Sequence, residues 1–370
     1  MSFKGNIIGQ VNDSGNLQDN SNPVWKLPDF PHFYHNADAL RPLEAAFKRH
    51  VSDLRQMEPS KLDPGDLLVS EIFSNSEIEG VVLDERGITE SLLGNISGDT
   101  MKKEQAAVDL MKLGVERAHD RLDHDVIKEL HRAIFRNKRG GKYMGGLLIV
   151  SGGRLDRQVI VDRGIPPDRV ESSMGEFIDW FNGRNKATPL YNAVRGHLHF
   201  ESIHPFHDGN GRVGRTLMNM GLMSDLGLSF PLALSRAIRS HKESYYGQFG
   251  TGSLDLTDPV KAFKPILVMA AEETRRMMAV TALRKSAYAQ GMNERQVRVF
   301  ERLCRYELTT GFEGNFTNEK YRKIAKISEE KTAMRDLKDL VEKGIFTKHG
   351  RLKGTSYRLA LPTQKFRGAR

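Results

Sequence analysis

Apolar residues before residue 310 recur mostly with the spacing of an α-helix, and this pattern limits the fold more than any other feature. Leu40, Leu43, Phe47, Val51 and Leu54 lie three or four residues apart, as on one face of an amphipathic helix. Similar patterns predict further helices at 67–79, 103–121, 125–135, 169–182, 193–202, 210–226, 260–288 and 293–308. The sequence therefore predicts a mainly α-helical fold, built as a helical bundle.

Two strand-like stretches interrupt this pattern, at 147–150 and 158–161. A glycine-rich turn separates them, so they are predicted to pair as one β-hairpin. The elements predicted after residue 310 are two short helices and two strands, at 318–325, 331–343, 345–348 and 355–361. With 293–308 as a first helix, this order predicts a C-terminal helix-turn-helix with one β wing.

Length and charge divide the chain of 370 residues into several parts. The predicted parts are an extended arm at 1–36, a helical region at 37–115, a core at 116–290 and a C-terminal domain at 291–370. The whole chain has a net charge of +9, and residues 311–370 alone hold 15 Lys+Arg and 7 Asp+Glu, a net of +8. Such an excess favours an acidic partner such as nucleic acid or phosphate, and it belongs to the C-terminal domain.

Composition excludes several classes of protein. With 39% hydrophobic and 28% charged residues, the chain suits a soluble globular protein and not a disordered one. No apolar run reaches the roughly 20 residues that cross a bilayer, and the first residues lack a secretory signal, so we expect a cytoplasmic location and no membrane contact. The single cysteine, Cys304, cannot form an internal disulfide and is predicted to pack on the side of a helix.

The stretch from residue 202 to residue 215 carries the most informative chemical groups. Gly209 and Gly211 flank Asn210 just before a predicted helix, and such a turn presents unpaired backbone N–H groups at the positive end of the helix dipole. Arg212 and Arg215 are three residues apart, so they lie on one face of that helix, where their forked guanidinium groups can grip two phosphates. These residues predict a phosphate-binding cradle.

Two further residues complete the predicted site. Asp208 supplies a hard oxygen ligand, suited to a Mg²⁺ ion that bridges phosphates. The imidazole of His204, in the preceding loop, is well suited to take a hydroxyl proton near neutral pH. A purely structural role for a glycine-rich turn and a histidine is the plainer alternative. A proton acceptor, a metal ligand and two phosphate-binding arginines occur together in one short stretch, and this combination favours the chemical interpretation.

A zinc site is another alternative for this region, because four histidines lie close together. They are His197, His199, His204 and His207. Two residues separated by one on a helix point to different faces, and neither a cysteine nor a well-spaced carboxylate completes a tetrahedral site. The pattern therefore favours phosphate chemistry over zinc.

The run His204-Pro-Phe-His-Asp-Gly-Asn-Gly-Arg-Val-Gly-Arg215 closely resembles the signature of the Fic family, and every specified position is filled. The resemblance covers about residues 40–290. It implies a Fic-type helical bundle in which the hairpin at 147–161 is a flap that binds the target chain by strand addition. It also implies transfer of AMP from ATP to a Ser, Thr or Tyr hydroxyl of a target protein, or of this chain itself, with pyrophosphate leaving.

The resemblance implies roles for individual residues. His204 would deprotonate the target hydroxyl, and Asp208 would hold Mg²⁺. The other nucleotide-binding residues that it implies are Gly209, Asn210, Gly211, Arg212, Arg215, Tyr245 and Tyr246. The two tyrosines resemble an aromatic pair near the adenine pocket, and ordinary packing is an equal alternative for them. Tyr143 and Met144 stand where the family often has an arginine, which leaves the identity of the target open.

Upstream, the run Glu71-Ile-Phe-Ser-Asn-Ser-Glu-Ile-Glu79-Gly resembles the inhibitory helix of Fic proteins, at about residues 67–80. In that family the glutamate pairs with the second arginine of the signature, here Arg215. A carboxylate on Arg215 would occupy the donors meant for the γ-phosphate of ATP. Asn75 stands where the family has Ser or Thr. The alternative is that Glu79 is an exposed carboxylate at a helix end with little effect.

The C-terminal domain resembles winged-helix domains in its order of elements. Lys331, Arg335 and Lys338 would face DNA from a helix in the major groove, whereas glutamates at the start of that helix would repel phosphate. DNA binding through residues 318–361 therefore stands beside dimerisation or docking of the target. Three functions stay open: a protein adenylyltransferase, a de-AMPylase that uses the same site, and a DNA-binding regulator with a nucleotide-sensing Fic body.

Overall fold

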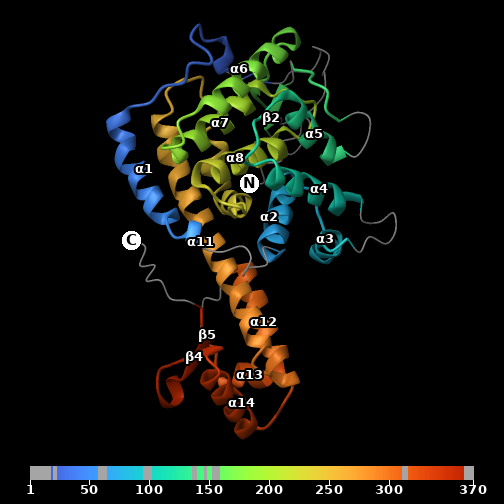
Figure 1. Ribbon diagram of the computed structural model, residues 1–370, viewed down its shortest axis with the longest axis vertical. Coiled ribbons are helices and arrows are strands. Elements are labelled where there is room, and N and C mark those ends of the chain that lie inside the picture. Colours follow the sequence, from blue (N-terminus) through green and yellow to red (C-terminus); the bar gives the residue numbers. More distant parts are fainter. Residues whose placement is uncertain are drawn as a thin grey trace. The chain divides into compact units, whose positions relative to one another are not determined.

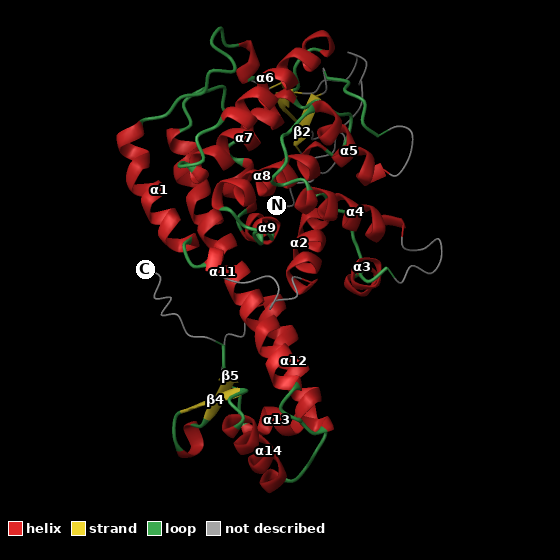
Figure 2. Ribbon diagram, in the orientation of Figure 1, coloured by secondary structure: helices red, strands yellow, loops and turns green. Residues whose placement is uncertain are grey.

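The structure is a computed structural model that describes residues 18–19, 23–56, 65–94, 102–135, 140–145, 148–151, 159–310 and 316–361. The chain divides into two compact units, the first made of residues 1–57 and 67–273 and the second of 58–66 and 274–370 (Figure 1). Helices dominate the described residues, so the prediction of a mainly helical fold is confirmed (Figure 2). No described helix has the length and apolar character needed to cross a membrane.

The first unit is a bundle of helices. They are α1 (Ala37–Val51), α2 (Gly65–Ile78), α3 (Glu85–Leu92), α4 (Lys102–Glu116), α5 (His124–Phe135), α6 (Val170–Gly183), α7 (Pro189–Ile203), α8 (Asn210–Leu226), α9 (Leu234–Ser240) and α10 (Lys242–Tyr246). The sequence patterns predict α1, α2 and α4 to α8. They do not predict α3, α9 and α10, because helices of one or two turns are too short to show a period of 3.6 residues.

Helices α7 and α8 lie side by side in the centre of the first unit (Figure 1). Helix α8 is buried on all sides, as expected of a core helix and not of a surface helix. Glycines set both of its ends, Gly209 at φ 85° and Gly227 at φ 63°. A residue with a Cβ atom adopts this left-handed conformation only at a cost, so the two glycines explain why the helix begins and ends as predicted.

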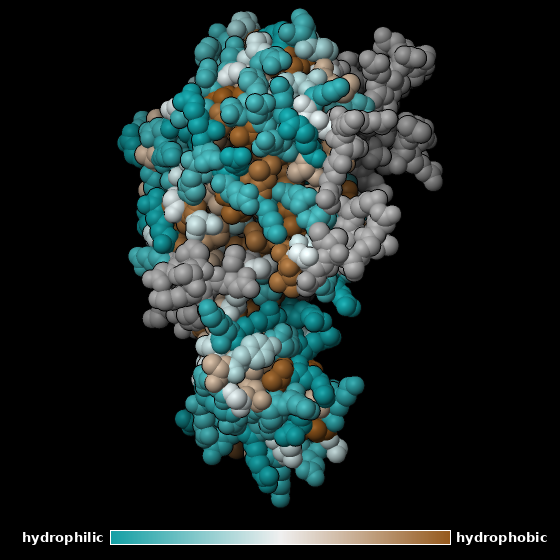
Figure 3. All heavy atoms as spheres, turned by 45° about the vertical axis from the view of Figure 1, so that its right-hand side comes forward, coloured by the Kyte–Doolittle hydropathy of each residue, from teal (hydrophilic) through white to brown (hydrophobic). Residues whose placement is uncertain are grey.

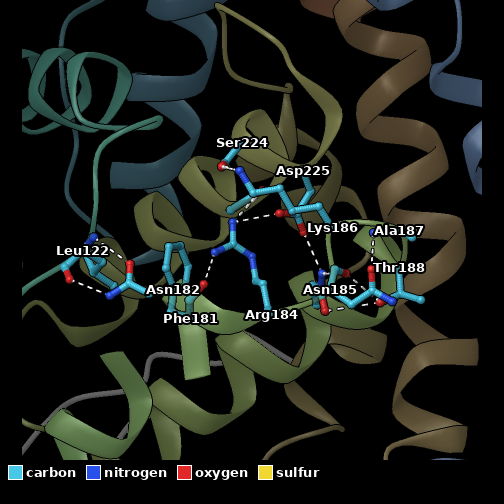
Figure 4. A network of polar contacts seen from close by, with 12 residues as sticks. Leu122, Phe181, Asn182, Arg184, Asn185, Lys186, Ala187, Thr188, Ser224 and Asp225 are labelled. Carbon is cyan, nitrogen blue, oxygen red and sulfur yellow. Dashed lines mark hydrogen bonds and ion pairs between the residues drawn. The ribbon is translucent and has the colours of Figure 1, made fainter. Parts of the chain in front are cut away.

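A buried ion pair joins the end of α6 to α8 (Figure 4). Arg184 Nη2 lies 2.8 Å from Asp225 Oδ1, and the two side chains are 5% and 1% exposed. Arg184 also donates to the carbonyl groups of Phe181 and Gly221, and Asp225 Oδ2 accepts from Asn192 Nδ2 of α7 at 2.8 Å. These hydrogen bonds offset the cost of burying both charges, so the network ties α6, α7 and α8 together.

A small sheet accompanies the helices of the first unit. Strands β2 (Leu148–Ser151) and β3 (Val159–Arg163) pair in antiparallel fashion, with an irregularity between Ile149 and Val150. This pairing confirms the predicted hairpin, whose turn lies outside the described residues. Strand β1 (Gln18–Asp19) pairs in parallel with β3, which gives the order β1-β3-β2. The sequence does not predict β1, since two residues carry no periodicity.

Helix α11 (Thr257–Tyr288) begins in the first unit and ends in the second. The other elements of the second unit are α12 (Glu294–Thr310), α13 (Asn318–Ala325), α14 (Glu330–Glu342), β4 (Phe346–His349) and β5 (Ser356–Leu359). An isolated bridge joins Phe316 to Tyr357 of β5. The predicted C-terminal hairpin is thus confirmed as a small sheet of two antiparallel strands.

The second unit has its own hydrophobic core. Its buried residues include Val299, Phe300, Leu303, Cys304, Tyr321, Leu337, Leu340, Ile345 and Phe346. Cys304 is 0% exposed, which confirms the prediction that it is a packing residue. The face seen in Figure 3 shows mainly hydrophilic residues over this unit, and Met334 and Leu352 are its most exposed large apolar side chains among those described.

Candidate active site

The loop between α7 and α8 holds the predicted signature residues. His204 caps the C-terminus of α7 in a left-handed conformation, at φ 50°. The ring of Phe206 is 0% exposed and stacks on His131 with 3.8 Å between ring centroids. The Asn210 side chain accepts from Phe206 N at 2.9 Å and donates to Phe206 O at 2.6 Å. These contacts hold the loop in one shape.

The side chain of Asn210 bonds the backbone of its own loop. Asn210 is 0% exposed, and both ends of its amide group bond the backbone of Phe206. One N–H of the amide group remains beyond these two bonds. Asn210 therefore holds the loop in shape from within.

Two glycines shape the start of α8. Gly209 is the N-cap and provides no side chain for the first turn of the helix. At Gly211 a Cβ atom would lie 2.4 Å from Glu79 Oε1 and 3.0 Å from Arg215 Nη1. A larger residue there would displace the end of the Glu79 or Arg215 side chain, because the Glu79 carboxylate lies directly against the first turn of α8. Helix N-termini favour anions, so the predicted cradle already holds the anionic side chain of Glu79.

Arg215 is one of the most deeply buried charged side chains in the described part of the chain, with 1% of the side chain exposed. Its Nη2 lies 2.7 Å from Glu79 Oε1, and Asn75 accepts from Arg215 Nε at 2.7 Å and from Nη2 at 3.2 Å. Burial alone would lower the pKa of Arg215, but the Glu79 carboxylate raises it well above the usual range. Glu79 is an exposed residue just after the end of α2, and its side chain, 28% exposed, pairs with Arg215.

Arg212 has a different set of partners. Its Nη2 lies 3.5 Å from Asp208 Oδ1, and its guanidinium carbon lies 5.7 Å from the ring centroid of Phe135. The two arginines are predicted to lie on one face of the helix, but they are held by different elements, Arg215 by α2 and Arg212 by the loop and α5. Asp208, the partner of Arg212, directly precedes the N-cap of α8.

Asp208 is the residue predicted to hold Mg²⁺. Its side chain is 53% exposed, and its Oδ1 accepts from Gly209 N at 2.6 Å. The described residues contain no group of three His, Cys, Asp or Glu side chains that would enclose a metal ion. A single exposed carboxylate fits Mg²⁺, which takes most of its ligands from water and phosphate oxygens when it binds with a nucleotide.

His204 is 5% exposed, and its Nδ1 lies 3.7 Å from Glu201 Oε2. Burial lowers the pKa of His204 to about 4, although the backbone of Glu201 and the charges of Glu79 and Asp208 act in the opposite direction. The imidazole is therefore neutral near pH 7 and can accept a proton.

The structure separates the two tyrosines predicted near the adenine base. Tyr245 is 1% exposed, its hydroxyl lies 2.7 Å from His197 Nε2, and its ring packs against Phe249 and Phe263. Its ring is not accessible to a nucleotide, so the packing alternative is correct for Tyr245. Tyr246 is partly exposed and packs edge-on against Tyr245 with 4.9 Å between centroids.

The four clustered histidines do not converge. His197 bonds Tyr245, whereas His199 lies among aromatic rings, including Phe33 and Phe177 at 5.4 Å between centroids. His207 is exposed and His204 is buried. The described residues therefore give no support to the zinc alternative.

Several residues near the site are not singled out by the sequence patterns. In the sequence, Asn75 stands out only because the family pattern has Ser or Thr at this position. The carboxylate of Glu71, 1% exposed on α2, accepts from Ser235 N at 2.9 Å, from Ser235 Oγ at 2.6 Å and from Asn219 Nδ2 at 3.2 Å. It fastens α2 to α8 and α9. A charged residue inside the apolar run of α2 was the available signal, since charges are rarely buried without partners.

Comparison with known proteins finds similarity in this region. The model of the Fic/DOC family matches residues 121–222. The protein adenylyltransferase fic-1 of Caenorhabditis elegans is 32% identical over 114 residues, which cover 30% of this chain and 21% of that protein. The protein adenylyltransferase Fic of Aedes aegypti is 32% identical over 125 residues, which cover 32% of this chain and 22% of that protein. The chain thus matches about a fifth of the length of these relatives.

A solved structure extends the likeness in fold. The crystal structure of a Fic family protein from Desulfovibrio desulfuricans G20 has a TM-score of 0.50 and is 21% identical, and the match covers 90% of this chain and 99% of that one. At this identity the likeness concerns the fold alone. The described helices α5 to α8 and the strands β2 and β3 fall within or overlap the matched family region.

Proposed function

Because the chain carries a Fic/DOC domain over residues 121–222 and is distantly related to protein adenylyltransferases, we propose that it transfers AMP from ATP to a protein hydroxyl, its own chain included. One observation carries the proposal: a single loop joins a buried neutral imidazole, His204, to a helix N-terminus that already holds a carboxylate. A base and an anion site so close together suit attack of a hydroxyl on a phosphate ester.

The proposed reaction uses the groups of this loop in sequence. His204 takes the proton of the target hydroxyl, and the hydroxyl oxygen attacks the α-phosphorus of ATP. The bond from that phosphorus to the bridging oxygen breaks, and pyrophosphate leaves with its electron pair. Arg212, Arg215 and the N–H groups of α8 neutralise the charge that develops on the leaving group. Asp208 would hold Mg²⁺, which adds charge neutralisation at the phosphates when bound.

The proposal includes inhibition by Glu79. Its carboxylate lies against Gly211 and 2.7 Å from Arg215 Nη2, so it competes for the donors that the γ-phosphate needs. Glu71 supports this arrangement by fastening the same helix to Ser235. Loss of the Glu79 carboxylate would leave Arg215 free for phosphate.

Label transfer from ATP tests the proposed reaction. The Glu79→Ala variant should become labelled by ATP carrying the label on the α-phosphate and not by ATP carrying it on the γ-phosphate. The matched control is Glu77→Ala, because Glu77 lies two residues away and pairs with Arg239 at the surface, with side chains 43% and 31% exposed. It should behave as wild type. An unlabelled Glu79→Ala variant, or label that persists after His204→Ala, would refute the proposal.

A second candidate function concerns the second unit, which we propose binds DNA through residues 318–361. The order of α12, the bridged residue Phe316, α13, α14, β4 and β5 resembles that of a winged helix-turn-helix, and this resemblance supports the proposal. Lys331, Arg335 and Lys338 are exposed on α14. A gel shift of duplex DNA should weaken with salt and weaken further when these three residues are replaced by alanine. A protein that shifts no DNA at low salt contradicts this candidate.

A further inference from the structure

We propose that Glu201 is a positioning residue for His204. Its carboxyl group faces Nδ1 of the imidazole, so that Nε2 takes the proton of the attacking hydroxyl. This inference rests on the proposed transfer of AMP, because it concerns the base of that reaction. No signature position specifies Glu201, and the motif begins three residues later.

The position of Glu201 follows from the end of α7. Residues three apart on a helix share a side, so Glu201 in the last turn reaches His204 at the C-cap. Glu201 Oε2 lies 3.7 Å from His204 Nδ1, and the side chains are 12% and 6% exposed. Glu201 Oε1 and both ring nitrogens of His204 are buried and make no hydrogen bond of normal geometry within the described residues, and the backbone of Glu201 also acts on the imidazole. A small movement of either side chain would close a hydrogen bond between them.

The neighbouring helix makes room for this carboxyl group. A Cβ atom at residue 214 would lie 2.4 Å from Glu201 Oε1, closer than to Phe200 at 3.1 Å or His197 at 3.2 Å. Gly214 stands at one of the unspecified positions of the signature, so the phosphate cradle itself does not require glycine there. The glycine leaves the space that the Glu201 carboxyl group occupies against α8.

The charge on Glu201 depends on groups from three other elements. The titratable and charged groups that act on it or respond to it are His204 on its own helix, Glu79 beyond α2, Arg215 on α8, and Tyr245 and Tyr246 on α10. Burial raises the pKa of Glu201 to about 8, while Arg215 lowers it and Glu79 raises it. Glu201 is therefore mostly protonated at neutral pH while Glu79 lies in the cradle.

This environment gives the carboxyl group a defined part in proton transfer. When His204 takes the hydroxyl proton at Nε2, the imidazolium presents Nδ1–H toward Glu201. An ionised carboxylate there stabilises the imidazolium and holds the tautomer that leaves Nε2 free, as buried carboxylates do beside catalytic histidines. The proton then passes from His204 to water or to the departing pyrophosphate, and Glu201 itself gains and loses no bond to substrate.

The kinetic test compares variants in the Glu79→Ala background. Glu201→Gln keeps the shape but removes the negative charge, so kcat should fall about tenfold at pH above the pKa of Glu201, with KM for ATP unchanged. The rise of kcat with pH that accompanies ionisation of Glu201 should vanish in this variant, and Glu201→Asp should restore part of it. Glu44→Gln is the matched control, because Glu44 is a buried carboxylate of α1 that accepts from Tyr191 N at the start of α7, far along that helix from Glu201. Equal kcat and pH profiles in Glu201→Gln and its parent overturn the proposal.

A spectroscopic test does not depend on activity. Histidine labelled with ¹⁵N reports the tautomer of each imidazole, and the His204 signal is the one that His204→Gln removes. Above the pKa of Glu201 the parent should show the tautomer with the proton on Nδ1, and Glu201→Gln should shift this signal toward a mixture. If no variant transfers AMP, the proposed function fails while this tautomer shift still supports the contact. An unchanged His204 signal overturns the contact itself.

Discussion

The ion pair between Glu79 and Arg215 makes a quantitative prediction about stability. Removing one partner of a buried ion pair typically costs about 3–5 kcal/mol, since the other charge stays buried. Arg215 keeps its two hydrogen bonds to Asn75, and the Glu79 side chain is 28% exposed. We therefore expect Glu79→Ala to lower the free energy of unfolding of the first unit by about 2–3 kcal/mol, which is at or below the low end of that range.

Thermal unfolding with and without ATP measures this effect. A loss of this size corresponds to a decrease in Tm of about 4–12 °C for a unit of about 260 residues. ATP at about 100 times its Kd adds about 2.7 kcal/mol, so it should restore most of the lost stability in Glu79→Ala. It should stabilise the wild type less, because Glu79 competes with the γ-phosphate there. Phosphate thus replaces the carboxylate as partner of Arg215.

A variant that removes a surface ion pair serves as the control. Glu77→Ala removes a surface ion pair with Arg239, so its Tm should change by the equivalent of about 1 kcal/mol or less. Equal Tm values for Glu79→Ala and the wild type would refute the reasoning about burial. An equal gain in Tm from ATP in both proteins would refute the competition between carboxylate and phosphate.

Three further predictions concern buried ionisable groups. Burial raises the pKa of Glu71 to about 7 from 4.5, so the folded state holds that proton more tightly and stability falls by up to about 3 kcal/mol as pH rises through this window. Glu71→Gln should remove this fall, which plots of Tm against pH would show. The same dependence of Tm on pH in the variant and the wild type would contradict the prediction. The double variant Glu79→Ala, Glu201→Gln isolates the titration of His204. Its rate of AMP transfer should stay constant through pH 6.5, because the pKa of His204 is lowered to about 4. A transfer rate that halves near pH 6.5 argues against His204 as a buried base. Asp225→Ala leaves Arg184 buried without its carboxylate, so urea unfolding should show a loss of about 3–5 kcal/mol, and a loss below about 1 kcal/mol would contradict the role of this pair.

Sequence patterns predict an element of the fold well when residues within or next to that element determine where it begins and ends. Helix α8 begins and ends at the predicted residues because Gly209 and Gly227 mark its ends. The hairpin of β2 and β3 follows from two strand-like runs and a turn. The short helices α9 and α10 escape prediction because their position depends on packing against distant residues and not on periodicity.

The environments of side chains in the candidate site do not follow from sequence patterns. Spacing alone puts Arg212 and Arg215 on one face, but their environments differ because α2 brings Asn75 and Glu79 to Arg215 only. Tyr245 carries the same local signal as Tyr246, and contacts made across the first unit bury one and not the other. Burial and long-range partners, which decide both charge state and access, are properties of the folded chain.

The most direct test of the proposed function is the mass of the intact protein after incubation with ATP and Mg²⁺. Glu79→Ala should gain the mass of one AMP group or more, and the wild type should gain less because Glu79 occupies the cradle. The double variant Glu79→Ala, His204→Ala should gain none. A Glu79→Ala protein of unchanged mass, or an equal gain in the double variant, would contradict the assignment of this loop as a site of AMP transfer.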